Sequence, residues 1–268
     1  MLADRIAEPF DGAALVAIDA VLGLPRAFGM RAEGNQFLAV AEELLASGAL
    51  ERASKRAADW SPASPFFAVP AGLGGLTRFL DRAGGRAMLY RQLERATGAR
   101  PVFARSGIPG TVGSGTIALW RALLAARRER PDRFRVWPFE IELEALPGAR
   151  CIAVAESYPR ACYAVALADA LPTRPRAIAK GSPRARRIAL DALQRASWIR
   201  ERSVEITGLE AALASEDDFD ALLQAAALVR LVDAGMPLTA PLVDPIWEGG
   251  ILGTGGATIR APNVPRRR

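Results

Sequence analysis

Two acidic residues stand directly after short apolar segments of the kind that form buried β-strands. Asp19 follows residues 14–18 (ALVAI), and Glu156 follows residues 151–155 (CIAVA). In open α/β sheets, ligands collect outside the carboxyl ends of the strands. We therefore expect Asp19 and Glu156 to lie near one crevice at the same edge of a sheet.

A second group of acids begins a helical pattern that covers residues 217–234. Asp217 and Asp220 are three residues apart, so they share one face of the expected helix. Closely spaced carboxylates repel one another unless a cation neutralises them, and oxygen ligands favour Mg²⁺ or Mn²⁺. Two such ions can activate a water and stabilise the leaving oxygen in phosphodiester hydrolysis. The predicted metal ligands and catalytic residues are therefore Asp19, Glu156, Asp217 and Asp220.

Each of these acids also has a structural explanation. Ser215 and Asp218 match a capping box, and the helix dipole favours acids in any first helical turn. Asp19 could cap the turn that follows it, and Glu156 could pair with Arg160 across one helical turn. Four acids within coordination reach of one point would favour an enzyme, whereas splayed or individually salt-bridged acids would favour a non-catalytic scaffold.

The composition limits the available chemistry. The 268 residues contain no histidine, which excludes Ser-His and Cys-His nucleophile pairs and histidine metal sites. Cys151 and Cys162 are too few for a disulfide framework, favour a reducing compartment and are predicted to be buried. The formal net charge of +6 comes almost entirely from arginine, and it weakly favours a nucleic-acid partner.

Several basic residues are candidates for contacts with phosphate groups. Lys180 precedes the segment Pro-Arg-Ala-Arg-Arg, and the predicted substrate-binding residues are Arg160, Lys180, Arg184 and Arg187. The alternative is a solvated helix face. The glycine-rich segment 107–115 resembles a phosphate-binding loop but lacks the P-loop lysine, so a glycine-rich turn is the competing interpretation.

The remaining pattern indicates an α/β domain with a largely parallel or mixed sheet, flanked by helices and carrying loop and helical insertions. Helical spacing of apolar residues covers residues 35–47, 86–97, 116–129, 183–200 and 217–234. We expect a single domain over residues 1–260 and a basic tail over residues 261–268. Without a signal sequence or a long apolar run, the protein is expected to be cytoplasmic with no membrane partner; the pattern does not set an oligomeric state.

Four segments together resemble a bacterial family called domain of unknown function 429. They are residues 16–25 (VAIDAVLGLP), 137–140 (WPFE), 155–160 (AESYPR) and 217–223 (DDFDALL). Members of that family are described as predicted nucleases with a ribonuclease H-like fold. The resemblance runs from about residue 14 to the segment WEGGIL at residues 247–252, and it implies the same four metal-facing acids and a phosphate contact at Arg160.

The chain departs from the family pattern at its beginning. Family members usually start with a strand that carries glycine and aspartate and with a hairpin, ahead of the motif IDxxLGLP, whereas this chain starts almost at that motif. The first acid of the family is therefore missing, either because the start codon is set too late or because this is a shortened relative. A shortened chain would favour a ribonuclease H-like scaffold that binds nucleic acid or protein, completed by a strand from a partner. A third alternative is a phosphotransferase of the related actin-like architecture, with segment 107–115 lining the crevice.

Overall fold

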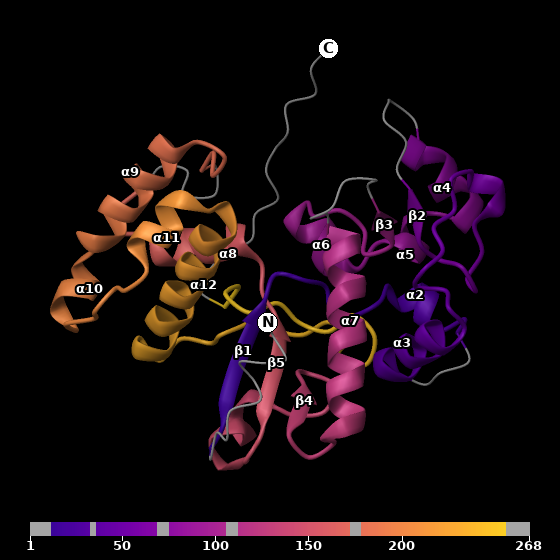
Figure 1. Ribbon diagram of the computed structural model, residues 1–268, viewed down its shortest axis with the longest axis horizontal. Coiled ribbons are helices and arrows are strands. Elements are labelled where there is room, and N and C mark those ends of the chain that lie inside the picture. Colours follow the sequence, from indigo (N-terminus) through magenta and orange to yellow (C-terminus); the bar gives the residue numbers. More distant parts are fainter. Residues whose placement is uncertain (1–11, 33–35, 69–74, 106–111, 172–177, 256–268) are drawn as a thin grey trace. The chain divides into compact units, whose positions relative to one another are not determined.

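The computed structural model describes residues 12–32, 36–68, 75–105, 112–171 and 178–255 (Figure 1). Contacts between Cα atoms divide the chain into two compact units. Of the described residues, unit 1 comprises those within 12–156 and 242–250, and unit 2 comprises those within 157–241 and 251–255. The sequence pattern predicted one domain over residues 1–260, and its basic tail lies outside the described residues.

The two units differ in their secondary structure. Unit 1 contains β1 (Ala14–Ile18), α2 (Arg26–Gly29), α3 (Phe37–Ala46), η1 (Ala57–Asp59), β2 (Phe67–Ala68), α4 (Gly75–Ala83), α5 (Arg86–Leu89), α6 (Gln92–Thr97), β3 (Ala104–Arg105), α7 (Val112–Glu129), β4 (Phe134–Val136), η2 (Leu143–Gly148) and β5 (Ile152–Glu156). Unit 2 contains α8 (Pro159–Ala166), α9 (Pro183–Gln194), α10 (Ser197–Glu201), α11 (Leu209–Ala214) and α12 (Glu216–Asp233). The protein therefore has the mixed α/β character that the sequence predicts.

The main sheet of unit 1 is parallel and has the strand order β1-β5-β4. The register pairs Ile18 of β1 with Glu156 of β5, so the two strands end at the same edge. All five residues of β5 are buried, because this central strand is covered on both faces, as parallel sheets usually are. A second parallel pair joins β2 and β3. Both apolar segments that were expected to form strands do so.

The core of unit 1 is aromatic and lies around α7. Trp120 on α7 is 1% exposed, and it packs edge-on against Phe37 of α3 and against Phe66. Its indole nitrogen also donates a hydrogen bond to the carbonyl of Val21, which lies in the loop that follows β1. This contact fixes the loop at the carboxyl end of β1, where Asp19 lies.

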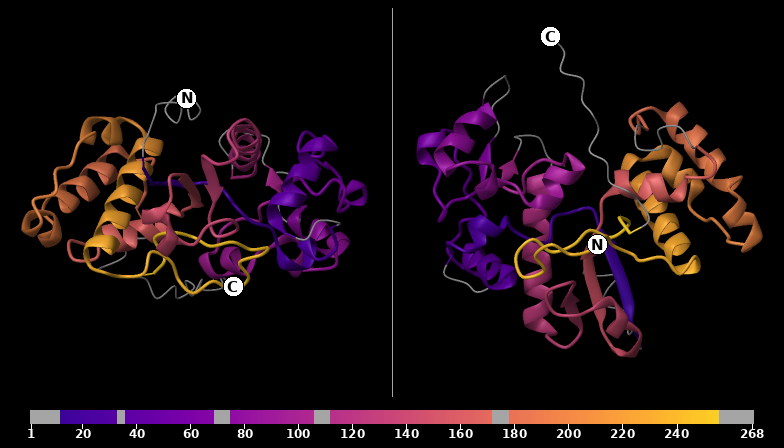
Figure 2. Two further views of the ribbon diagram at one scale, coloured as in Figure 1. Left: turned by 90° about the horizontal axis from the view of Figure 1, so that it is seen from below. Right: turned by 180° about the vertical axis from the view of Figure 1, so that it is seen from behind.

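Unit 2 is a helical unit built around α12. One face of α12 carries Phe219, Leu223, Ala227 and Leu231, all buried and spaced four residues apart. This face packs against α8, as the views in Figures 1 and 2 also show. Tyr163 of α8 lies edge-on to Phe219, with 5.6 Å between the ring centroids.

Two long helical patterns are interrupted in the structure. The pattern over residues 86–97 forms α5 and α6, separated at Arg91, whose backbone and side chain both take part in buried hydrogen bonds. The pattern over residues 183–200 forms α9 and α10, separated at Ala196. Among the described residues, no helix has the length and hydropathy needed to cross a membrane.

Candidate functional site

The carboxyl edge of the main sheet carries the two acids that the strand pattern placed there. Asp19 directly follows β1 and is exposed, whereas Glu156 ends β5 and is buried, with 5% of its surface exposed. Because β1 and β5 are parallel and Ile18 is paired with Glu156, both acids belong to the same edge of the sheet. This arrangement follows the expectation from sequence.

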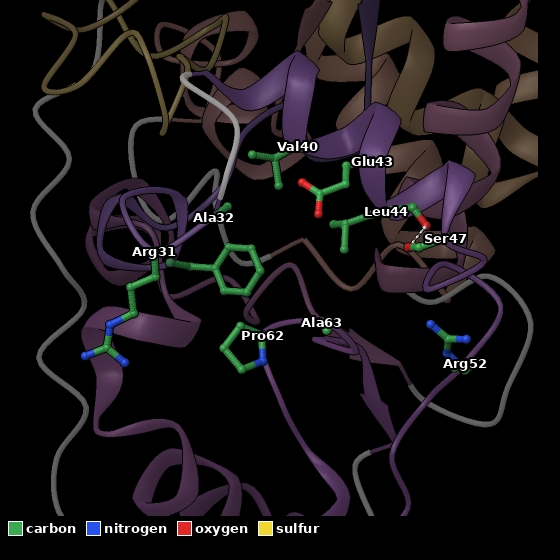
Figure 3. Close-up of a pocket in the computed structure, with 10 residues that line it drawn as sticks. Arg31, Ala32, Val40, Glu43, Leu44, Ser47, Arg52, Pro62 and Ala63 are labelled. Carbon is green, nitrogen blue, oxygen red and sulfur yellow. Dashed lines mark hydrogen bonds between the residues drawn. The ribbon is translucent and has the colours of Figure 1, made fainter.

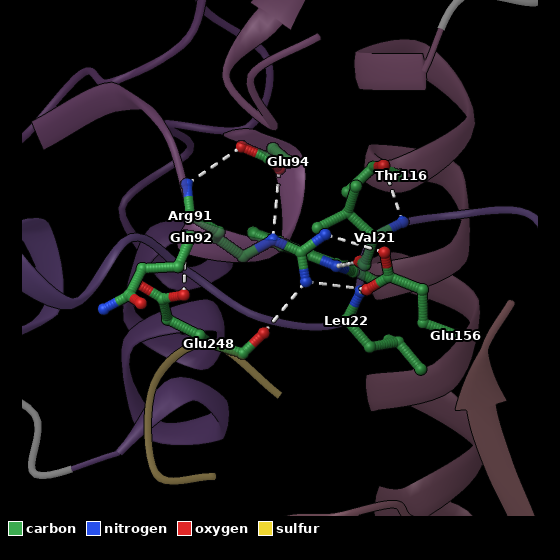
Figure 4. Close-up of polar contacts among 9 residues, drawn as sticks. Val21, Leu22, Arg91, Gln92, Glu94, Thr116, Glu156 and Glu248 are labelled. Carbon is green, nitrogen blue, oxygen red and sulfur yellow. Dashed lines mark hydrogen bonds and ion pairs between the residues drawn. The ribbon is translucent and has the colours of Figure 1, made fainter. Parts of the chain in front are cut away.

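Glu156 is held by internal donors. Arg91 makes a two-pronged ion pair with it, with 2.7 Å from Nη2 to Oε1 and 2.8 Å from Nη1 to Oε2 (Figure 4). The backbone N–H of Leu22 also donates to Oε2, at 2.8 Å. Both carboxylate oxygens therefore accept charge-assisted or backbone hydrogen bonds inside unit 1. The sequence suggested Arg160 as the partner of Glu156, but the partner in the structure is Arg91, 65 positions away along the chain.

Arg91 is the centre of a wider buried network. Its Nε donates to Glu94 at 3.1 Å, and its Nη1 donates to the carbonyl of Glu248 at 2.9 Å. The carboxylate of Glu248 accepts a hydrogen bond from the backbone N–H of Gln92 at 2.6 Å. Arg91, Glu94 and Glu248 are at most 2% exposed. One buried cation is therefore paired with two buried carboxyl groups, those of Glu94 and Glu156, and is also bound by the backbone carbonyl of Glu248.

The network changes the protonation of its members. Burial raises the pKa of Glu94 to about 7, and the attraction of Arg91 only partly opposes this effect. Burial tends to lower the pKa of Arg91, but the negative charges of Glu156 and Glu94 outweigh burial and raise it above its ordinary value. Arg91 is therefore charged at any physiological pH, whereas the Glu94 carboxyl group titrates near neutrality.

The close packing of this network depends on a glycine. Gly23 has a φ of +150°, and a Cβ at this position would overlap the carbonyl of Glu248. Leu24 donates a backbone hydrogen bond to Trp247 at 2.7 Å, so segment 242–250 lies directly against the loop after β1. The glycine in the LGLP motif thus brings Glu248 close to Arg91.

The two acids of α12, Asp217 and Asp220, differ in burial and in their contacts. Asp220 is 4% exposed, and its two carboxylate oxygens contact the hydroxyl of Tyr163 and the ammonium group of Lys180. Asp217 is exposed. The two acids lie about 60° apart around α12, as three-residue spacing requires, but their burial differs because α8 covers Asp220 and leaves Asp217 exposed. Ser215 accepts a hydrogen bond from the N–H of Asp218 at 3.2 Å, so Ser215 is the N-cap of α12, which is one half of the expected capping box.

These contacts test whether the four acids could hold Mg²⁺ or Mn²⁺. Asp19 and Glu156 belong to unit 1, and Asp217 and Asp220 belong to unit 2. The oxygens of Glu156 and Asp220 already accept hydrogen bonds from cationic side chains, and a divalent ion would have to displace Arg91 and Lys180. Within each unit, the described residues contain no group of three Asp, Glu or Cys side chains placed to hold a metal ion. The donor set found here does not fit the predicted metal site.

The basic candidates fall into two groups. Lys180 is engaged with Asp220, whereas Arg160, Arg184 and Arg187 are exposed and make no ion pair with any described residue. Arg186 belongs to the same basic segment that was expected to contact phosphate, but it is buried and donates to the carbonyls of Leu213 and Lys180. The segment 107–115 lies largely outside the described residues, so its role as a phosphate loop stays a prediction.

Comparisons with known proteins add no relative. No protein-family model, no curated protein and no solved structure matches this chain. The resemblance to the family of domain of unknown function 429 therefore stays a prediction, and the function must be argued from the geometry.

Proposed function

We propose that the protein binds nucleic acid through an arginine-rich face of α9 and does not cleave it. The observation that carries this proposal is a contrast between the acidic and the basic candidates. The buried acids Glu156 and Asp220 are neutralised by Arg91 and Lys180, whereas arginines on α9 are exposed without an ion pair among the described residues. Individually salt-bridged acids favour a binding scaffold over an enzyme.

The exposed face of α9 has the spacing of a phosphate-binding surface. Arg184 and Arg187 lie on α9, and Arg195 is its C-cap with helical backbone angles. The three are separated by three and eight residues, so their side chains leave the helix within an arc of about 80° at 100° per residue. The interval from Arg184 to Arg195 spans about 17 Å of helix, over which duplex DNA carries about ten phosphate charges. Asp191 is the only acid within this interval, and it lies inside the same arc, so the three arginines give this face a net charge of +2. The opposite face, with Leu190 and Leu193, is buried in the core of unit 2.

We also propose that unit 1 has a ribonuclease H-like fold. Support for it comes from the parallel order of β1, β5 and β4, with Asp19 and Glu156 at one edge, and from the motif resemblance. Under this interpretation the acid at the end of β5 has become a structural residue that holds Arg91. The sheet then serves as a scaffold, and binding rests on positive charge.

Binding is tested by fluorescence anisotropy with a labelled 20-base-pair DNA duplex at several salt concentrations. The triple variant Arg184→Gln/Arg187→Gln/Arg195→Gln should bind at least tenfold more weakly at 100 mM salt. Each phosphate contact that the variant lacks leaves its counterions on the DNA, so binding releases fewer of them. The slope of log K against log salt should become shallower by about 2 to 3. The duplex should be recovered intact after incubation with the protein and Mg²⁺ or Mn²⁺.

The matched control removes the same charge from unit 1. Arg78, Arg82 and Arg128 are also exposed without an ion pair among the described residues, and their change to Gln should leave the affinity within about twofold. Equal losses in both triple variants would show that net charge alone drives binding and would overturn the assignment to α9. Cleavage of the duplex that disappears in Glu156→Gln would instead favour the nuclease.

A further inference from the structure

Unit 1 contains a pocket of about 300 Å³ between α2, α3 and the turn at residues 61–64 (Figure 3). Its apolar residues Phe28, Val40 and Leu44 are each at most 5% exposed, so they leave little apolar surface for a ligand. A larger exposed apolar surface lies in unit 2, on α12.

The side of α12 that faces away from α8 carries a row of exposed apolar residues. Val229 and Val232 are 46% and 65% exposed. Ala221 and Ala225, which precede them, are exposed as well. At 100° per residue, these four side chains leave the helix within an arc of about 80°, and residues 221–229 include no charged residue. Single exposed apolar residues are common, but a row over three helical turns is typical of a surface that another segment covers.

Acidic residues stand at the amino end of this row. Glu216, Asp217 and Asp218 occupy the first turn of α12, and Asp218 lies within the same arc as the apolar row. From Val232 to Asp218 the row extends over about 21 Å at 1.5 Å per residue. A segment that fits this surface therefore needs apolar side chains along most of its length and a cation at its far end.

The described part of the chain ends beside the carboxyl end of α12. A Cβ at Gly255 would overlap the carbonyl of Pro237, which lies four residues after the helix. The N–H of Gly253 donates to the carbonyl of Leu238 at 2.8 Å, so this segment lies against the turn that follows α12. Residues 256–268, which are outside the described residues, therefore begin next to the apolar end of the row.

Residues 256–268 have the chemistry that this surface requires. Ile259 and Val264 supply apolar side chains, and Arg266 begins a run of three arginines. These cations are opposite in charge to the acids of the first turn of α12. Because the segment is joined to the same unit, its effective concentration at α12 is on the order of millimolar, far above that of a free partner with similar contacts.

The length of the segment also agrees with the length of the row. Pro262 and Pro265 favour an extended backbone, which advances about 3.1 Å per residue. Ile259 and Arg266 are seven residues apart, so such a backbone separates them by about 22 Å. This separation is close to that between the apolar and acidic ends of the row. The prolines also reduce the backbone entropy that docking would cost.

We propose that residues 256–268 dock along the exposed row of α12, antiparallel to the helix. The segment covers the apolar side chains, and its arginines neutralise the acids at the start of α12. Three side chains of the segment then meet three of the helix: Ile259 meets Val232, Val264 meets Ala221, and Arg266 meets Asp218. The inference concerns α12 alone and does not depend on nucleic-acid binding by α9.

Disulfide formation in the full chain tests the register. Cys151 and Cys162 are buried, so oxidised glutathione should act selectively on a pair of introduced cysteines. Ala221→Cys/Val264→Cys should form an internal disulfide at least tenfold faster than Val232→Cys/Val264→Cys, because the proposed register separates the second pair by about 17 Å. A segment that moves freely would favour the second pair, which lies nearer to the start of the segment. Equal rates, or a faster second pair, would overturn the proposal.

Two changes to α12 test the contacts in the background of the faster cysteine pair. Val229→Ser/Val232→Ser should slow the internal disulfide about fivefold or more, because the apolar contact with the segment is lost. Asp217→Asn/Asp218→Asn should slow it about threefold and make its rate insensitive to salt, because the attraction for the arginines is removed.

The matched controls remove the same chemistry elsewhere in unit 2. Ile188→Ser removes an exposed apolar side chain of α9, and Glu205→Gln/Glu210→Gln removes two exposed acids. Both should leave the rate within about twofold, and circular dichroism checks that every variant is folded. Rates in the α12 variants equal to those of the controls would overturn the proposal. Disulfides between two chains in place of internal ones would also overturn it and would assign the row to a second copy of the protein.

Discussion

Replacement of Arg91 by Met should destabilise the protein by about 3–5 kcal/mol. The guanidinium group is 1% exposed and neutralises Glu156 and Glu94 through direct ion pairs. Its removal leaves buried carboxylates without a counter-charge, which costs far more than the net stabilisation from the intact pair. Arg91→Lys should also destabilise, because an ammonium group cannot bridge both carboxylates in the planar geometry of Figure 4.

Urea denaturation followed by tryptophan fluorescence measures this loss, since Trp60, Trp120, Trp137 and Trp247 all belong to unit 1. The control is Arg56→Met, which removes an exposed ion pair with Asp59 and should leave the midpoint unchanged. The double variant Arg91→Met/Glu156→Gln should recover part of the loss, because it removes one stranded charge. A midpoint for Arg91→Met equal to that of the control would contradict the account of the network.

Protonation of Glu94 should make unit 1 more stable in mild acid than at pH 8. The pKa of this carboxyl group is raised by burial to about 7 in the folded protein, against about 4.5 when unfolded. The folded state thus binds the proton more tightly. The stabilisation is complete below pH 4.5 and is lost as the pH rises through 7. The shift corresponds to about 3 kcal/mol.

The comparison that isolates Glu94 is its change to Gln, which keeps an acceptor for Arg91 but cannot ionise. As the pH rises from 5 to 8, the wild-type protein should lose up to about 3 kcal/mol of unfolding free energy that Glu94→Gln keeps. Other titrating groups cancel in this difference. Parallel stability profiles over this range would show that Glu94 does not titrate there.

Local patterns in the sequence predicted much of the fold. The apolar segments before Asp19 and Glu156 form β1 and β5, because buried parallel strands need continuous apolar residues. The cysteines are buried as expected, and Ser215 caps α12. These features depend on neighbouring residues, so one segment of sequence suffices to predict them.

The contacts of the candidate site could not be predicted in this way. Arg91 lies in a helical pattern, and nothing near it shows that its partner is Glu156, 65 residues later, or that Glu248 follows 157 residues later. A helical wheel places Asp217 and Asp220 on one side, but only the packing of α8 decides that Asp220 is buried beside Tyr163. Long-range pairing therefore determines which acids are neutralised.

The most direct test of the central claim is calorimetric titration of Mn²⁺ and Mg²⁺ into the whole protein. If Glu156 and Asp220 are held by Arg91 and Lys180, no saturable binding should occur at submillimolar metal, and Glu156→Gln and Asp220→Asn should give the same baseline as wild type. Stoichiometric binding that is lost in both variants would contradict the account. It would show that the acids release their internal partners to hold metal, and it would restore the nuclease as the better interpretation.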